Sequence, residues 1–432
     1  MNNRDPFIYK TTDYGKTWKS ISSDIPKTVF SYVHVVREDP VRMGLLYAGT
    51  ENGLYVSFND GGNWVPLQMN LPHAPVPWLT IQEHFSDLVV VTYGRGFWIL
   101  DNITPLRALT PQVLQADAHL FAPRPTYRFL HIGAPMTHEA DQADGENPPY
   151  GAAITYWLKA PPKGDVKITI RDEAGRTVRV LDGTKEKGIN RVWWDLRHER
   201  STLAKLRTPP LHAPWVKPGP EGWRPIVTWA VPGEGVRPLA VPGTYTVKLS
   251  VGGRDTTEKL VVKKDPNSTG TEADIHAQVK LSLEIRDNLN AVVDMINRLE
   301  VIRKQIADLG VAVEGRPDAD AILHPAKELD QKLTAFEENL FQMRLTGGGQ
   351  DVFRNPTKLY ERLGFLAQMV QTSWGDVGSD YAPTNQQMEV HQLLSTQLAT
   401  CQGQFRTLMQ SDVPAFNEFL YKKSAKPLVT DF

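Results

Sequence analysis

The chain has 432 residues, a formal net charge of −1 and 41% hydrophobic residues. A chain of this length is expected to divide into about two to four domains. The nearly equal numbers of basic and acidic residues argue against a general nucleic-acid or anionic-membrane binder, which needs an excess of positive charge. No apolar run is long enough for a membrane-spanning helix. The single cysteine, Cys401, excludes an internal disulfide and a cysteine-based metal cluster.

A repeat near the N-terminus is the most informative feature of the sequence. Residues 11–18 (TTDYGKTW) and 57–64 (SFNDGGNW) align without a gap, and their tryptophans are 46 positions apart. This period matches one four-stranded propeller blade of about 40–50 residues. A third, degenerate copy occupies residues 88–102, and the pattern ends at 103–106. We therefore expect an incomplete β-propeller, its last two to three blades, in residues 1–108.

The residue types in this motif suit a tight turn between two strands. An Asp or Asn side chain can accept a hydrogen bond from a backbone N–H group two residues ahead, and glycine supplies the positive φ that the turn needs. The tryptophan is expected to bury its ring between strands of the blade. The predicted turn residues are Thr11, Asp13, Gly15, Thr17 and Trp18 in the first copy, and Ser57, Asn59, Asp60, Gly61 and Trp64 in the second.

The pattern S/T-x-D/N-x-G-x-T-W resembles the Asp box, the bacterial neuraminidase (BNR) repeat of sialidases, sortilin-like propellers and xyloglucanases. Residues 46–50 (LYAGT) and 93–101 (YGRGFWILD) are most similar to large sortilin-type propeller proteins of bacteria, often labelled glycosyl hydrolases. The resemblance covers residues 1–105 and implies a secreted or periplasmic location. Because two to three blades cannot close a ring, we expect a fragment of a longer chain, with further blades and the signal peptide upstream.

Strand-like segments with Pro- and Gly-rich turns occupy residues 118–265. Apolar alternation predicts strands at 151–158, 165–172, 177–181, 188–197, 241–249 and 257–262, with a hairpin between the second and the third. The patterns N-x-V-x-W-D-L (190–196) and P-G-x-Y-x-V (242–247) resemble the immunoglobulin-like module of the flagellar hook-capping protein and fibronectin type III-like domains. We expect an immunoglobulin-like β-sandwich, interrupted by a Pro/Trp-rich insertion at about 199–238.

After Pro266 the spacing of apolar residues changes to that of helices. Residues 271–274 form a capping-box-like start. Apolar stripes then run from Leu289 to Ile306, Leu329 to Met343, Leu359 to Val370 and Met388 to Leu408. Four amphipathic stretches with short links predict a C-terminal antiparallel helical bundle over residues 271–425. The overall expectation is a multidomain protein, β-rich first and then α-helical.

No catalytic residue, cofactor or metal ligand is predicted. A sialidase-like site would need an arginine cluster, and none of the arginines in residues 1–105 lies in a motif that identifies it. Arg95, between two glycines, could reach the propeller face and contact a ligand, with a structural role in a hairpin as the alternative. Asp13 and Asp60 are explained by the turns. The acidic segment 138–147 has calcium-type oxygen ligands but not the register of a calcium loop.

Tryptophans gather in the predicted insertion, where Trp215, Trp223 and Trp229 are candidates for contact with a sugar ring. The alternative is that these rings pin the long insertion in place, while Trp193 or Trp194 points into the core. The sequence favours a non-catalytic extracellular binding or scaffold protein with a protein, peptide or carbohydrate ligand at the propeller face. The competing hypothesis is the C-terminal part of a secreted glycoside hydrolase whose catalytic residues lie in upstream blades.

Overall fold

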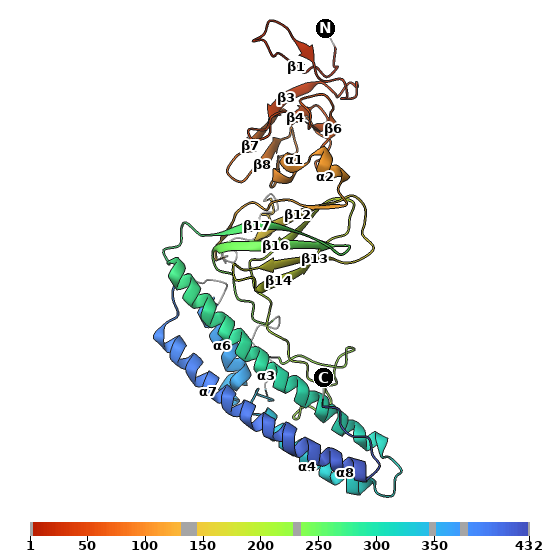
Figure 1. Ribbon diagram of the computed structural model, residues 1–432, viewed down its shortest axis with the longest axis vertical. Helices are drawn as coiled ribbons and strands as arrows, with labels where there is room; N and C mark the ends of the chain where they lie inside the picture. The colour runs from red at the N-terminus through yellow and green to blue at the C-terminus, as the bar shows by residue number, and fades with distance from the viewer. Residues whose placement is uncertain (1–2, 131–144, 228–234, 345–350, 372–378, 431–432) are drawn as a thin grey trace.

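The structure is a computed structural model that describes residues 3–130, 145–227, 235–344, 351–371 and 379–430. Several β-sheets occupy the first part of the chain and helices occupy the C-terminal part (Figure 1). Small sheets, a pair of larger sheets and the helices follow one another along the long axis of the molecule. None of the helices in the described ranges is long and apolar enough to cross a membrane. The predicted order of β-rich and then helical regions is confirmed.

Three antiparallel sheets with two, four and three strands lie within residues 3–100. Their strands are β1 (Tyr9–Lys10), β2 (Lys19–Ser20), β3 (Val33–Glu38), β4 (Leu46–Thr50), β5 (Gly53–Ser57), β6 (Val65–Pro66), β7 (Trp78–Gln82), β8 (Asp87–Val91) and β9 (Phe97–Leu100). Within each sheet the strands pair in sequence order, as β1-β2, β3-β4-β5-β6 and β7-β8-β9. The apolar residues Phe7 and Ile8 precede β1 and are not part of it.

The second and third sheets approach each other closely. The backbone N–H of Val76 donates to the carbonyl of Thr50 at 2.8 Å. A Cβ atom at Gly49 would lie 2.5 Å from the Val76 carbonyl oxygen, so only glycine fits at this point of β4. After β9 the strand pattern ends, and two short helices follow, α1 (Thr104–Ala108) and α2 (Pro111–Gln115).

Two larger sheets enclose one hydrophobic core in the middle of the chain. Their strands are β10 (Ala118–Leu120), β11 (Thr126–Arg128), β12 (Ala152–Leu158), β13 (Val166–Arg171), β14 (Thr177–Asp182), β15 (Gly188–Trp194), β16 (Gly243–Val251) and β17 (Arg254–Lys264). The orders are β10-β12-β15 and β11-β17-β16-β13-β14. The predicted hairpin is confirmed as β13 paired with β14, and β11 pairs with β17 in parallel. Trp194 is completely buried in the shared core.

The insertion between β15 and β16 runs along the first long helix, α3 (Glu272–Ala312). The amide side chain of Asn290 accepts from the backbone N–H of Thr202, and that of Asn297 accepts from the N–H of Lys205, both at 2.7 Å. Leu206 of the insertion is fully buried in the same core as the helices. We call residues 200–208 the strap, because this segment lies against α3 and joins the middle sheets to the helical region.

The helical region contains α3, α4 (Ala319–Glu337), α5 (Asp351–Arg354), α6 (Leu359–Gln371), α7 (Asn385–Thr407), a π-helical turn η1 (Leu408–Asp412) and α8 (Val413–Lys422). Helix α3 begins at the predicted capping box, in which Thr271 and Asp274 bond each other's backbone N–H groups. A second capping box, formed by Thr384 and Gln387, starts α7.

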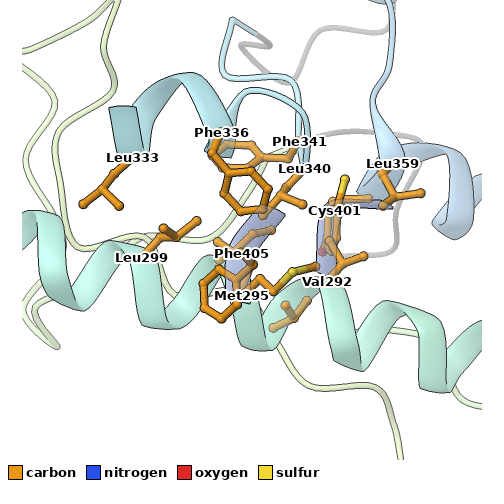
Figure 2. Close-up of a cluster of buried hydrophobic side chains, with 14 of the residues drawn as sticks. Val292, Met295, Leu299, Leu333, Phe336, Leu340, Phe341, Leu359, Cys401 and Phe405 are labelled. Atoms are coloured by element: carbon orange, nitrogen blue, oxygen red, sulfur yellow. The ribbon is translucent and has the colours of Figure 1, made fainter. Parts of the chain in front are cut away.

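Apolar residues from α3, α4, α6 and α7 meet in one core (Figure 2). Leu299, Leu333, Leu363 and Leu394 are fully buried in it, and their spacing is the one that the sequence predicted. Met388 is 50% exposed, although the pattern placed it on the buried stripe of its helix. This residue lies in the first turn of α7, six residues before Leu394, where the helix reaches the core.

Candidate functional site

The first copy of the repeated motif, residues 11–18, forms a tight turn between β1 and β2. Asp13 accepts from the backbone N–H of Thr17 at 2.8 Å and from its hydroxyl at 2.7 Å, while the Thr11 hydroxyl accepts from the Gly15 N–H at 2.8 Å. These bonds span four residues and not two, because Tyr14 and Gly15 both have positive φ and widen the loop. Hydrogen bonds from the backbone and then the side chain of Thr17 lower the pKa of Asp13.

The second segment repeats this geometry between β5 and β6. Ser57 accepts from the Gly61 N–H at 2.9 Å, and Asn59 accepts from the Asn63 N–H at 2.8 Å. Asp60 has a φ of 61° and Gly61 a φ of 81°. The carboxylate of Asp60 forms an ion pair with Lys10 of β1. The polar side chains of both motifs are therefore engaged in turn formation, except that of Asp60, which contributes its positive φ to the turn and pairs its carboxylate with Lys10.

The two tryptophans of the motif have different environments. Trp64 is 4% exposed, and its indole N–H donates to the carbonyl of Ile21 at 2.6 Å. Trp18 is 60% exposed, although we expected both rings to be buried. The difference arises because Trp64 is covered by Ile21, which follows the preceding turn, and the described residues hold no counterpart of Ile21 against Trp18.

Substitution of Ser57 by alanine should lower the free energy of unfolding by about 1–3 kcal/mol, because the buried N–H of Gly61 loses its acceptor. The matched control is Thr11→Ala, in which the released N–H of Gly15 is exposed to water and the loss should be smaller. Urea unfolding of both variants measures the difference. Equal losses of unfolding free energy in the two variants would show that the burial of the Gly61 N–H does not add to the cost of losing its acceptor.

The structure gives the candidate arginines separate local roles. Arg95 is exposed in the β8–β9 turn, and its carbonyl accepts from the indole N–H of Trp98 at 3.0 Å. Arg42 donates to the carbonyls of Leu106 and Leu109 at 2.8 and 3.0 Å, at the end of α1. Arg95 therefore remains accessible to a ligand, whereas Arg42 anchors a helix.

The candidate tryptophans of the insertion lie in different settings. Trp215 is 76% exposed. Trp223 is half-buried, with the Nζ atom of Lys205 over its ring at 5.3 Å from the centroid. Trp229 lies outside the described residues, as do residues 138–144 of the acidic segment. No group of three metal-type ligands occurs among the residues that the structure describes.

A cavity of about 740 Å³ lies where the β7–β8 turn meets one end of the two middle sheets. Its aromatic residues are Phe85 in the β7–β8 turn, Tyr127 in β11, Phe129 after β11, Tyr150 before β12 and Trp193 in β15. Phe129 and Tyr150 meet edge to face at 4.8 Å between ring centroids. We call this space the aromatic cavity.

Polar groups fix the geometry of the aromatic cavity. Tyr150 donates its hydroxyl proton to the carbonyl of Phe129 at 2.9 Å, and burial raises the pKa of Tyr150. The guanidinium of Arg124 lies over the ring of Phe85 at 5.3 Å from the centroid and 3.5 Å from the carboxylate of Asp87. Aromatic faces beside fixed donors can hold a flat, hydroxyl-rich ligand such as a sugar ring.

The aromatic cavity was missed from the sequence. Its rings come from four segments between residues 85 and 193, and no periodic pattern joins them. The available signal was the position of Tyr150 directly before the strand predicted at 151–158 and of Trp193 within the strand predicted at 188–197. That signal becomes meaningful only when the strand ends are known to meet.

Comparisons with protein-family models, curated proteins and solved structures gave no match. The interpretation of the aromatic cavity therefore rests on its own geometry.

Proposed function

We propose that this chain is a non-catalytic binding protein that holds a carbohydrate ligand in the aromatic cavity. The observation that carries the proposal is the convergence of five aromatic side chains from four segments on one cavity. Sugar rings stack on aromatic faces, and their hydroxyl groups bond to side chains placed around the rings. Arg124 and Asn267 line the same space and supply such groups.

The lining favours binding over hydrolysis. Glycoside hydrolysis normally needs two carboxyl groups about 5–10 Å apart across the bond that breaks. Asp265 is the one carboxylate among the residues that line the described cavity. The Asp-box carboxylates do not supply a second one, because Asp13 and Asp60 are occupied by their turns and by Lys10.

The same proposal includes the finer fold assignment. The period of 46 residues, the four-stranded meander β3-β4-β5-β6 and the repeated turn geometry support a terminal part of an Asp-box propeller in residues 1–108. Two sheets around one core support an immunoglobulin-like sandwich in residues 118–265. With these modules we also propose the secreted or periplasmic location that the sortilin-like resemblance implies.

The proposal is tested by titrating the purified chain with β-glucan, xyloglucan and sialyl oligosaccharides and following tryptophan fluorescence, because Trp193 lines the cavity. Phe85→Ala and Phe129→Ala should each weaken binding about five- to tenfold through the lost ring contact. Tyr93→Ala is the matched control, because Tyr93 is 79% exposed and does not line the cavity.

The same mixtures should show no increase in reducing ends, because binding without a second carboxylate does not cleave the chain. Failure of every oligosaccharide to bind, or equal affinities in both cavity variants and the control, would refute the proposal. Turnover that Asp265→Asn abolishes would favour the hydrolase alternative.

A further inference from the structure

A groove follows the exposed face of α3 between the strap and α7. Two cavities of about 620 and 550 Å³ both border Asp294 and Arg298 of α3, so they lie next to each other on this helix, and together they make up the groove. The floor of this groove consists of Ala291, Asp294, Arg298 and Val301, which are spaced three or four residues apart on one side of the helix. Ten residues of helix correspond to about 15 Å, which sets the length of the floor.

The strap forms one wall, and its backbone is held in place by α3. Glu300 accepts from the backbone N–H groups of Arg207 and Thr208, the latter at 2.7 Å. Asn297 accepts from the N–H of Lys205 at 2.7 Å and donates to the carbonyl of Leu203 at 3.3 Å. Because these backbone groups of the strap are already bonded to α3, a ligand in the groove would contact the side chains of the strap and not its main chain.

The opposite wall comes from the end of α7 and the π-helical turn η1. Phe405 and Arg406 of α7 and Met409 and Gln410 of η1 line the groove. Figure 2 shows Phe405 next to Met295 of α3, where the groove meets the core. Interruptions of this kind in a helix are frequently found at functional sites, because they change the direction of the side chains that follow.

Positive charge dominates the lining of the groove. Five cations line it, Arg200, Lys205, Arg207, Arg298 and Arg406, against the single carboxylate of Asp294. Asp294 lies 4.0 Å from Arg298. Among the described residues, the other four cations have no carboxylate within ion-pair distance. Their charge is thus available to an anionic ligand, although the whole chain is almost neutral.

The groove is unsuited to two kinds of polyanion. A peptide that adds as a strand needs free backbone groups, and those of the strap are bonded to Asn290, Asn297 and Glu300. Single-stranded nucleic acid needs open aromatic faces for its bases. The rings nearest the groove are covered, Phe405 by Arg298 and Trp223 by Lys205, each at 5.3 Å.

From this geometry we infer that the groove between the strap and α7 binds an acidic oligosaccharide, a sugar chain that carries carboxylate or sulfate groups. Guanidinium groups bind such anions in a bidentate manner, and the side chain of Gln402 offers hydrogen bonds to hydroxyl groups. The inference is independent of the aromatic cavity, which is lined by other residues.

Calorimetric titration of the whole chain with hexagalacturonate and with a heparin-derived hexasaccharide tests the inference and separates the carboxylate from the sulfate source. At least one should bind, and its affinity should fall as the salt concentration rises, because ionic contacts are screened. Arg207→Gln and Arg406→Gln, one from each wall, should each weaken binding about three- to tenfold, and the double variant by the product. Neither residue belongs to the core, so melting temperatures should not change.

Lys16→Gln removes one charge from an exposed turn outside the groove and should bind like the parent chain. Cellohexaose is the uncharged control and should not bind to the groove. Equal binding of cellohexaose, or unchanged affinity in both arginine variants, would overturn the inference. So would tighter binding of poly-glutamate or an oligodeoxythymidine that is lost in the same variants.

Discussion

Arg128→Met is expected to lower the free energy of unfolding by about 3–5 kcal/mol. The side chains of Arg128 and Asp380 are only 1% and 2% exposed, and their guanidinium and carboxylate groups form a direct ion pair. Arg128 also donates its Nε–H to the carbonyl of Ala240 at 2.9 Å. Methionine keeps much of the volume of the arginine side chain but leaves the charge of Asp380 buried without a partner. A buried, unpaired charge lowers the free energy of unfolding far more than the loss of an exposed ion pair does.

This ion pair connects two regions that are far apart in the sequence. Arg128 ends β11 of the middle sheets, and Asp380 precedes α7 of the helical region. The approach is close, because a Cβ atom at Gly270 would lie 2.0 Å from the carbonyl oxygen of Asp380. We therefore expect Arg128→Met to loosen the junction between the sheets and the helices as well as to lower stability.

Urea unfolding followed by circular dichroism measures the effect. The matched control is Arg254→Met, which breaks an ion pair with Asp117 whose side chains are 83% and 79% exposed, and it should cost less than about 0.5 kcal/mol. Changing Arg128 to Met together with Asp380 to Leu should recover most of the loss, because no buried charge remains. A loss below 1 kcal/mol in Arg128→Met would contradict the expected role.

The second large effect concerns pH. The carboxyl group of Glu337 is completely buried at the end of α4, and burial, followed by the charge of Glu300, raises its pKa to about 8. Its Oε2 atom accepts from Arg303 at 2.6 Å, and its Oε1 atom has no partner among the described residues. The charged groups around it are Glu300, Arg303, Asp330 and Arg224.

Because the pKa of Glu337 is higher in the folded state than in the unfolded state, the folded chain holds a proton that the unfolded chain releases. The stabilisation that this bound proton gives is complete below the pKa that Glu337 has in the unfolded chain. It is lost as the pH rises through about 8, the pKa of Glu337 in the folded chain. Burial lowers the pKa of His198 to about 4. Below pH 6.5 this group therefore makes the free energy of unfolding rise with pH, opposite to the effect of Glu337. Above pH 6.5 the titration of Glu337 therefore outweighs that of His198. The free energy of unfolding should fall by about 2 kcal/mol between pH 6.5 and pH 8.5.

Unfolding free energies at pH 6.5 and 8.5 test this expectation in the parent chain and in Glu337→Gln, whose amide resembles the protonated carboxyl group. The variant should be less sensitive to pH by about 2 kcal/mol. Burial also raises the pKa of Glu361, so some dependence of the same sign will remain. Glu328→Gln, on the exposed side of α4, is the control and should keep the full slope of the parent. Identical slopes in all three chains would show that Glu337 is ionised when folded.

Local features of the fold were predictable from the sequence. The β13–β14 hairpin and the stripe from Leu289 to Ile306 both follow from alternation or helical spacing over a few residues. The positive φ of Gly15 and Gly61 and the capping box at Thr271 depend on residues no more than four positions apart. Such features are determined by the sequence because the interacting groups are neighbours in the chain.

The tertiary structure decided the features on which function depends. The strap was recognised in the sequence only as part of an insertion, and its contact with Asn297 and Glu300 requires α3 to lie beside it. The rings of the aromatic cavity, the Arg128–Asp380 pair and the burial of Trp64 but not Trp18 also join or separate distant segments. No local pattern encodes these contacts, because each depends on the summed packing of whole sheets and helices that brings distant side chains together.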